Sequence, residues 1–125
     1  VNVNSAFYLT QALLPLLRNS DDGRILFTSS SVGRKGRAFW GAYAASKAAT
    51  ENLSQTLAEE LENTSKIRVN TINPGATRTD MRALAYPGED AEKLKSPEQI
   101  VASYLYLLGP EGAAINGQSL DAQPR

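Results

Sequence analysis

Tyr43 and Lys47 stand four residues apart in the segment WGAYAASKAAT (residues 40–50), which is rich in helix-forming alanine. Residues four apart on a helix lie on the same face, so the lysine ammonium can approach whatever the phenol approaches. A free phenol is a weak base at neutral pH, but a nearby cation favours its ionised form. The pair is therefore a candidate proton-transfer device. The alternative is a half-buried tyrosine beside a solvated lysine, and the spacing alone does not exclude it.

The composition narrows the chemistry that these 125 residues can perform. They contain no cysteine and no histidine, which removes disulfides, thiolate nucleophiles, Cys/His zinc sites and imidazole-based triads. Thirteen basic residues balance thirteen acidic ones, and no basic stripe that could bind nucleic acid is present. No apolar run is long enough to cross a membrane, and no export signal is visible. We expect a cytoplasmic protein with neither nucleic acid nor membrane as a partner.

The elements that must position the pair alternate between helices and short apolar strands. Residues 3–18, 42–63 and 97–109 are expected to be helices, and Ser96, Pro97 and Gln99 have the pattern of a capped start for the third. Residues 24–30, 66–73 and 117–122 are expected to be strands. This alternation predicts an α/β fold with a parallel sheet, of which three strands are visible. In the second helix Ala45, Ala49, Leu53, Leu57 and Leu61 recur every fourth residue and are expected to form an apolar stripe.

The arrangement of four sequence elements resembles the short-chain dehydrogenase/reductase family. Its Tyr-x-x-x-Lys signature, with a serine thirteen residues upstream, matches Tyr43, Lys47 and Ser30. The opening VNV resembles the segment that holds the family's catalytic asparagine, which corresponds to Asn2. The segment NPGATRTDM resembles the loop that holds the nicotinamide end of the cofactor, which corresponds to Pro74, Gly75, Thr77 and Thr79. Within the family, SSSVGR, WGAYAASK and NPGATRT together resemble a bacterial subgroup, the YciK-like oxidoreductases.

The resemblance implies a role for each matched residue. Tyr43 is expected to exchange a proton with the substrate oxygen while hydride moves between the substrate carbon and the nicotinamide. Lys47 is expected to favour the phenolate and to bind the nicotinamide ribose, so both residues would also contact the cofactor. Ser30 is expected to hold the substrate oxygen, and Asn2 to anchor a water that links Lys47 to solvent. A hydroxyl donor, a phenol and a cation are together suited to carbonyl reduction.

Several of these assignments have alternatives. Ser29 and Ser31 flank Ser30, and Asn4 competes with Asn2; either asparagine could also be a helix cap. Thr77 and Thr79 could be turn formers after the Pro-Gly pair. The basic residues Arg34, Lys35 and Arg37 are expected to form a solvated loop. Arg78 and Arg82 could receive an anionic substrate, although a surface role is the preferred interpretation.

A dinucleotide site needs a glycine-rich turn between the first strand and helix of its fold, and none of the nine glycines forms one. In the family that turn precedes the catalytic asparagine. We therefore expect residues 1–125 to be the C-terminal half of a single doubly wound Rossmann-type domain, lacking the first strands. The expected cofactor is NAD or NADP, with a slight preference for NADP, although the discriminating residues belong to the absent half. These residues alone should show no saturable NAD(P)H binding.

Two functions from different classes follow. The first is an NAD(P)-dependent oxidoreductase that interconverts a small-molecule carbonyl and its alcohol in an intact parent protein, with residues 80–96 shaping the substrate site. An extended-branch epimerase or dehydratase fits the NPG segment less well. The second is a truncated or non-catalytic module that acts by association. The resemblance also implies a homodimer or homotetramer, because the family commonly packs the helices that correspond to residues 3–18 and 42–63 against their symmetry mates. Both helices are rich in apolar and small residues, which suits such a contact.

Overall fold

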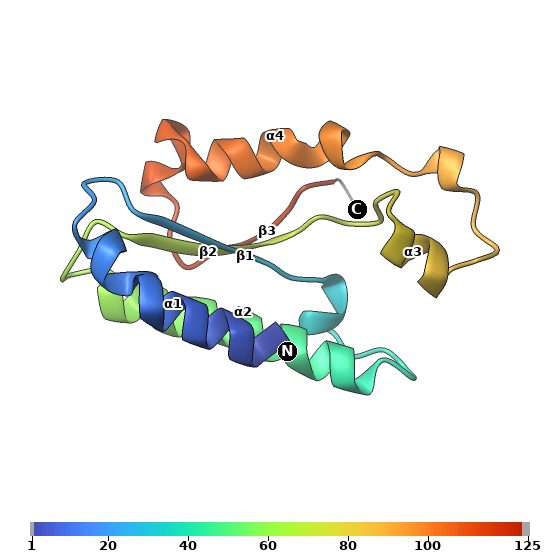
Figure 1. Cartoon of the computed structure of the whole chain (residues 1–125), viewed down its shortest axis with the longest axis horizontal. Helices are drawn as coiled ribbons and strands as arrows, with labels where there is room; N and C mark the ends of the chain where they lie inside the picture. Colours follow the sequence, from blue (N-terminus) through green and yellow to red (C-terminus); the bar gives the residue numbers. More distant parts are fainter. Residues whose placement is uncertain (1, 124–125) are drawn as a thin grey trace.

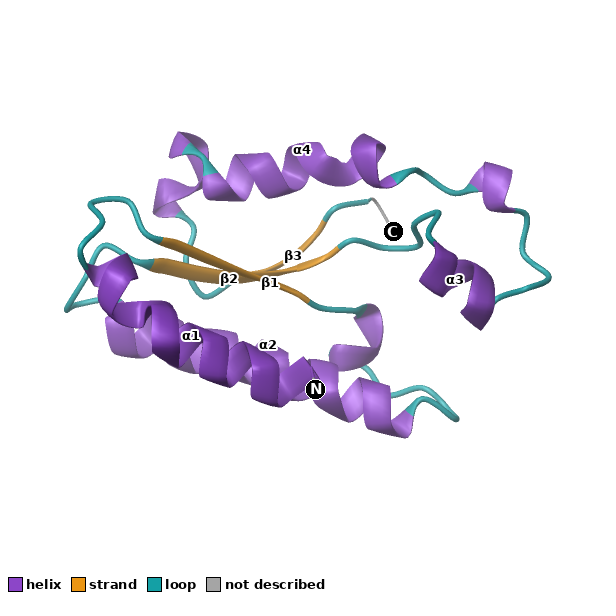
Figure 2. Ribbon diagram, viewed as in Figure 1, coloured by secondary structure: helices purple, strands orange, loops and turns teal. Residues whose placement is uncertain are grey.

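A computed structural model describes residues 2–123 (Figures 1 and 2). The helices are α1 (Asn2–Arg18), α2 (Gly41–Leu61), α3 (Asp80–Ala85) and α4 (Pro97–Leu108). Three short 3-10 helices are η1 (Ser31–Gly33), η2 (Ala91–Lys93) and η3 (Pro110–Ala114). The strands are β1 (Arg24–Thr28), β2 (Arg68–Asn73) and β3 (Ser119–Asp121). The alternation expected from the sequence is therefore confirmed, except that α3 lies in a segment expected to be a loop.

The three strands form one parallel sheet in the order β1-β2-β3, which confirms the predicted α/β architecture. The register pairs Phe27 with Thr71 and Ile72 with Leu120. Helices α1 and α2 cover one face of the sheet and α4 covers the other, as Figure 1 shows. Because the strands are parallel, all their carboxyl ends meet at one edge of the layer, where open α/β sheets bind their ligands. Within the described residues, β1 is a free outer strand of this sheet.

The core lies between the sheet and the two helices on its first face. Ala58 and Leu61 of α2 pack there against Ile67 and Val69, all of them 4% exposed or less. Partly buried apolar residues close this core from α1, β1 and α2, namely Leu14, Leu17, Ile25, Phe27 and Leu57. Burial of apolar surface on this scale is the main stabilising contribution to such a layer.

The buried face of α2 differs from the predicted stripe. Its buried residues are Thr50, Glu51, Ser54, Ala58 and Leu61, whereas Ala45 is exposed and Leu53 is half-buried. A strict four-residue repeat drifts around a helix that has 3.6 residues per turn, so its first members leave the face that its last member occupies. The face that meets the sheet follows the alternating three- and four-residue spacing of positions 51, 54, 58 and 61 and includes polar side chains.

The segment after β2 is more ordered than the sequence indicates. The Thr79 hydroxyl accepts a hydrogen bond from the Arg82 N–H at 3.1 Å and caps the start of α3. Further along, α4 begins after Ser96, whose N–H donates to the Gln99 side chain at 2.7 Å, as the capping pattern predicts. None of the helices within residues 2–123 has the length and apolarity needed to span a membrane.

Candidate active site

The sequence-predicted catalytic residues come from elements that meet at the carboxyl end of the sheet. Ser30 follows β1 and is the extended residue before η1, with φ −152°. Ser29 is 2% exposed and its N–H continues the ladder to the Ile72 carbonyl at 2.8 Å, whereas Ser30 is half-buried. A hydroxyl that binds substrate must be reachable, so burial disfavours Ser29. The geometry is therefore consistent with Ser30 as the serine candidate.

Tyr43 and Lys47 lie in the first two turns of α2, and both are half-buried. The Lys47 ammonium is 5.7 Å from the centroid of the Tyr43 ring, which is within reach of a cation–π contact. It also donates a hydrogen bond to the Thr28 carbonyl at the end of β1, at 3.0 Å. Burial lowers the pKa of Lys47, because desolvation disfavours its charged form. The two side chains thus share one face, as their spacing predicts.

Gly33 brings the serine-bearing segment against the lysine. A Cβ at Gly33 would lie 2.9 Å from the Lys47 carbonyl carbon and 2.9 Å from its Cβ. Such separations are too short for carbon atoms, and the first of these is to backbone, which cannot rotate away. The close approach of η1 to α2 therefore depends on the absence of a side chain at this position.

Asn2 begins α1 beside the same turn of α2. Its Nδ2 donates to Ser46 Oγ at 3.2 Å, and Ser46 Oγ donates to the Tyr43 carbonyl at 2.7 Å. Asn2 therefore contacts the residue adjacent to Lys47, which favours it over Asn4 as the asparagine candidate.

The loop after β2 holds Pro74, Gly75, Thr77 and Thr79. Gly75 has φ +76°, a left-handed conformation that suits glycine, and its N–H donates to Asn73 Oδ1 at 3.0 Å. Gln123 Nε2 donates to the carbonyls of Pro74 and Ala76 at 2.8 and 2.9 Å. The Thr77 hydroxyl donates to the Gly75 carbonyl at 3.0 Å, so both threonines have structural contacts in this loop.

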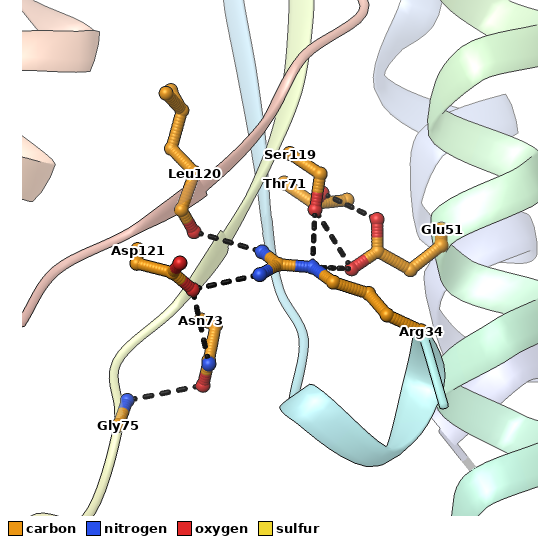
Figure 3. A network of polar contacts seen from close by, with 8 residues as sticks. All are labelled: Arg34, Glu51, Thr71, Asn73, Gly75, Ser119, Leu120 and Asp121. Carbon is orange, nitrogen blue, oxygen red and sulfur yellow. Dashed lines mark hydrogen bonds and ion pairs between the residues drawn. The ribbon is translucent and has the colours of Figure 1, made fainter. Parts of the chain in front are cut away.

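A network of polar contacts centred on Arg34 connects these segments (Figure 3). Its guanidinium donates from Nη1 to Asp121 Oδ1 at 2.7 Å, from Nε to Ser119 Oγ at 3.0 Å and from Nη2 to the Leu120 carbonyl at 3.1 Å. Its Nε is also 3.5 Å from Glu51 Oε1. Residues 34–37 form an exposed loop, as predicted, but the prediction is wrong for the Arg34 side chain, which is only 23% exposed and binds β3 and α2.

Glu51 occupies the buried end of this network, one turn after Lys47. Its carboxylate accepts hydrogen bonds from the hydroxyls of Thr71 at 2.8 Å and Ser119 at 3.0 Å. Burial raises the pKa of Glu51, but the hydroxyls of Ser29, Thr71 and Ser119 and the charge of Arg34 outweigh it and hold the pKa below its usual value. The side chain is therefore an ionised carboxylate that joins α2 to two strands.

Replacing Glu51 with glutamine is expected to lower the free energy of unfolding by about 1–3 kcal/mol at neutral pH, because the buried donors lose a charged acceptor. Since the folded pKa is depressed, the ionised carboxylate stabilises the fold above the usual value of 4.5, and this contribution is lost as the pH falls through the folded value. Thermal unfolding followed from neutral to acidic pH checks both effects. The wild-type protein should lose more stability with acid than Glu51→Gln, while exposed Glu59→Gln should retain the wild-type slope. Parallel slopes in all three proteins contradict this role for Glu51.

The donors at this edge fit part of a nicotinamide dinucleotide. An ammonium has three donors, and the Thr28 carbonyl uses one of those on Lys47, which leaves two for ribose hydroxyls. The loop from Pro74 to Thr79 follows a parallel strand, where such sheets bind ligands. The sequence contains no glycine-rich turn for the pyrophosphate, so these donors fit the nicotinamide end of such a cofactor and not its pyrophosphate.

Comparison with known proteins supports the family assignment. The family model described as short chain dehydrogenase matches residues 1–90. The Escherichia coli K12 protein named uncharacterized oxidoreductase YciK is 60% identical over 124 residues, which are 99% of this chain and 48% of that protein.

Solved structures show the same likeness. A short chain dehydrogenase from Pseudomonas syringae is 63% identical with a TM-score of 0.95, and the match covers 98% of this chain and 50% of that one. A short chain dehydrogenase from E. coli CFT073 in complex with NADPH is 60% identical with a TM-score of 0.95, and covers 99% of this chain and 51% of that one. The chain thus spans about half the length of these relatives. Together with the family match, these likenesses show that the chain belongs to the short chain dehydrogenase family.

Proposed function

We propose that residues 1–125 are the C-terminal catalytic part of a single NAD(P)-binding Rossmann domain, in an oxidoreductase that interconverts a carbonyl and an alcohol. The observation that carries this proposal is the half-buried tyrosine–lysine pair on α2, held beside the end of β1 through the Lys47–Thr28 hydrogen bond, in a chain of this family. The outer edge of β1 is suited to pairing with a further strand from an N-terminal half.

In this mechanism Tyr43 is the acid in the reducing direction and the base in the oxidising direction. Its hydroxyl gives a proton to the substrate oxygen as that oxygen gains negative charge, while Ser30 donates a hydrogen bond to the same atom. Lys47 places a positive charge near the phenol, 5.7 Å from the centroid of its ring. Asn2, through its contact with Ser46, holds the start of α1 where a water can connect Lys47 to solvent.

The proposed cofactor is NAD or NADP, which supplies or accepts the hydride when bound. The residues proposed to contact it are Tyr43 and Lys47, together with the loop residues Pro74, Gly75, Thr77 and Thr79. NADP is preferred, because two similar structures are described as complexes with NADP and NADPH.

The exposed apolar side chains of α1 support the proposed assembly into a homodimer or homotetramer through residues 3–18 and 42–63. They are Phe7, Tyr8, Leu9, Leu13 and Leu16. A second copy that packs α1 and α2 against their equivalents would bury them. We place this assembly in the cytoplasm, with a small-molecule carbonyl or alcohol as its substrate.

The test requires a complete cofactor site. We define the completed protein as residues 1–125 preceded by the N-terminal half of the E. coli relative. It is supplied with NADPH or NADH that carries deuterium at the transferable position, and with a panel of aldehydes and ketones. The expected result is an alcohol with deuterium on the former carbonyl carbon, formed only in the presence of cofactor. Residues 1–125 alone serve as the control and should form none.

A second candidate is a non-catalytic module that acts by association, which the exposed apolar face of α1 favours. It predicts that the completed protein transfers no deuterium to any carbonyl, although it binds NADPH and forms a dimer or tetramer in sedimentation. That combination of results would reject the oxidoreductase proposal.

A further inference from the structure

Two aromatic side chains continue from Tyr43 into the segment that follows β2. The Trp40 ring lies edge-on to the Tyr43 ring, with centroids 5.8 Å apart and planes at 61°. Trp40 also stacks on Tyr86, the residue that follows α3, with centroids 6.0 Å apart and planes at 22°. Both geometries are favourable for aromatic pairs. We call Trp40 and Tyr86 the aromatic wall.

The aromatic wall is held in place by a fixed arginine. The Arg82 guanidinium lies 3.8 Å from the centroid of the Tyr86 ring and forms two hydrogen bonds with Glu89, from Nε at 2.8 Å and from its second terminal nitrogen at 2.9 Å. A guanidinium that stacks on a ring and is held by both oxygens of a carboxylate has a defined position. Tyr86 is therefore supported by both Arg82 and Trp40.

The charges in this segment are balanced. Arg82 is neutralised by Glu89, and Arg78 has a longer ion pair of 3.6 Å with Glu92. Residues 78–95 contain four basic and four acidic residues, so the segment offers no net attraction to an anion. An anionic substrate at Arg82 would have to displace Glu89, and the Arg78 pair is exposed to solvent, where an ion pair contributes little.

Apolar side chains are exposed on the same two segments. Phe39 precedes Trp40 with φ 71°, a left-handed conformation that is rare for a bulky residue, and its ring is fully exposed. On α3, Met81 is 65% exposed and Leu84 is 84% exposed. Backbone strain of this kind is common at ligand sites.

We propose that Trp40 and Tyr86 are specificity-determining residues that contact the body of the substrate, and that this body is neutral and apolar. The inference rests on the proposed function, because it places the substrate carbonyl at Tyr43 and Ser30. From there the substrate body extends along the aromatic wall, which buries apolar surface. Exposed Arg37 donates to the Tyr86 hydroxyl at 3.5 Å. An ion pair with an exposed cation contributes little, so it would not offset the hydration that a carboxylate on the body loses.

The first experiment compares two aldehydes that differ in one charge. The completed protein is assayed with benzaldehyde and with 4-carboxybenzaldehyde. We expect kcat/KM to be about tenfold or more higher for benzaldehyde, the range in which apolar pockets discriminate. Glu89→Gln should narrow this preference, because it releases Arg82 to bind the carboxylate. A wild-type preference for the carboxylate, or equal values for both aldehydes, overturns the inference.

The second experiment removes the rings. Trp40→Leu and Tyr86→Leu should each lower kcat/KM for benzaldehyde about tenfold or more, with a smaller loss for propanal, which is too short to cover the wall. Tyr86→Phe should recover most of the loss with benzaldehyde. Tyr106→Leu removes an exposed ring from α4 and is the matched control. It should leave kcat/KM unchanged for both substrates. Equal losses for both substrates in the Trp40 and Tyr86 variants mean that the aromatic wall is only structural, which rejects the inference.

The inference and the proposed function can fail separately. If deuterium is transferred but benzaldehyde is not preferred, the oxidoreductase proposal stands and the inference of a neutral, apolar substrate is rejected. If neither aldehyde reacts, binding is measured by tryptophan fluorescence of the completed protein. The signal of Trp40 is the difference between the fluorescence of the wild type and that of Trp40→Leu. Benzyl alcohol should quench this signal at lower concentration than 4-carboxybenzyl alcohol. The reverse order, or no difference, rejects the inference.

Discussion

Replacing Tyr43 with phenylalanine in the completed protein is expected to lower kcat by about 10²–10⁴-fold, the usual contribution of a positioned general acid or base. The substitution removes one oxygen and retains the ring that Trp40 and the Lys47 ammonium contact. The fold and the affinity for NADPH should therefore stay largely unchanged. Steady-state kinetics and NADPH titration measure the two effects separately, and only the first should be large.

Tyr104 provides the matched control for this substitution. Its hydroxyl shares a hydrogen bond of 3.1 Å with Thr28 Oγ1, on the face of the sheet covered by α4. Tyr104→Phe therefore removes a bonded phenol oxygen outside the proposed proton path, and kcat should stay within the same order of magnitude as the wild type. Retained turnover in Tyr43→Phe would show that Tyr43 is not the acid or base. An equal loss of turnover and NADPH affinity would point to misfolding.

Much of the layer could be predicted from local patterns. The strand Arg24–Thr28 has an apolar middle, and Arg68–Asn73 is rich in β-branched residues and stops before the Pro74-Gly75 pair. The start of α4 has a capping pattern within four positions. The proximity of Tyr43 and Lys47 could also be predicted, because helix geometry alone brings residues four apart to one face. These features share a cause: the interactions that determine them lie within one turn or one strand.

The Arg34 network could not be predicted in the same way. Arg34 contacts Glu51 and Asp121, which lie 17 and 87 residues further along the chain, and no local pattern connects them. The sequence held one indication that Glu51 faces the sheet, which is the helical spacing of Glu51, Ser54, Ala58 and Leu61 on one face of α2. Two of those four residues are polar, so a search for apolar residues at helical spacing does not find this face. Buried polar groups are nevertheless stable where they have hydrogen-bond partners. Helix α3 was missed because six residues make fewer than two turns and show no periodicity.

Gly33→Ala tests whether the close approach of η1 to α2 matters for chemistry. The added methyl group would meet the Lys47 backbone at 2.9 Å, so one of the two segments must move. Because η1 follows Ser30 directly and Lys47 belongs to the tyrosine helix, this movement separates the proposed substrate donor from the proposed acid. A displacement of about 1 Å is enough to lower the rate about 10²-fold. We therefore expect kcat/KM of the completed protein to fall by about that factor.

Gly36 gives this prediction an internal control, since it lies in the same loop and a Cβ there would meet nothing within 4 Å. Gly36→Ala should keep kcat/KM close to wild type. Overpacking at Gly33 also costs about 1–3 kcal/mol of stability, so thermal unfolding must be measured beside activity. If Gly33→Ala is active while it is folded, the serine segment does not need this approach to α2. If it loses activity at temperatures where its unfolding curve shows a folded protein, the distance between the two segments is itself part of the catalytic geometry.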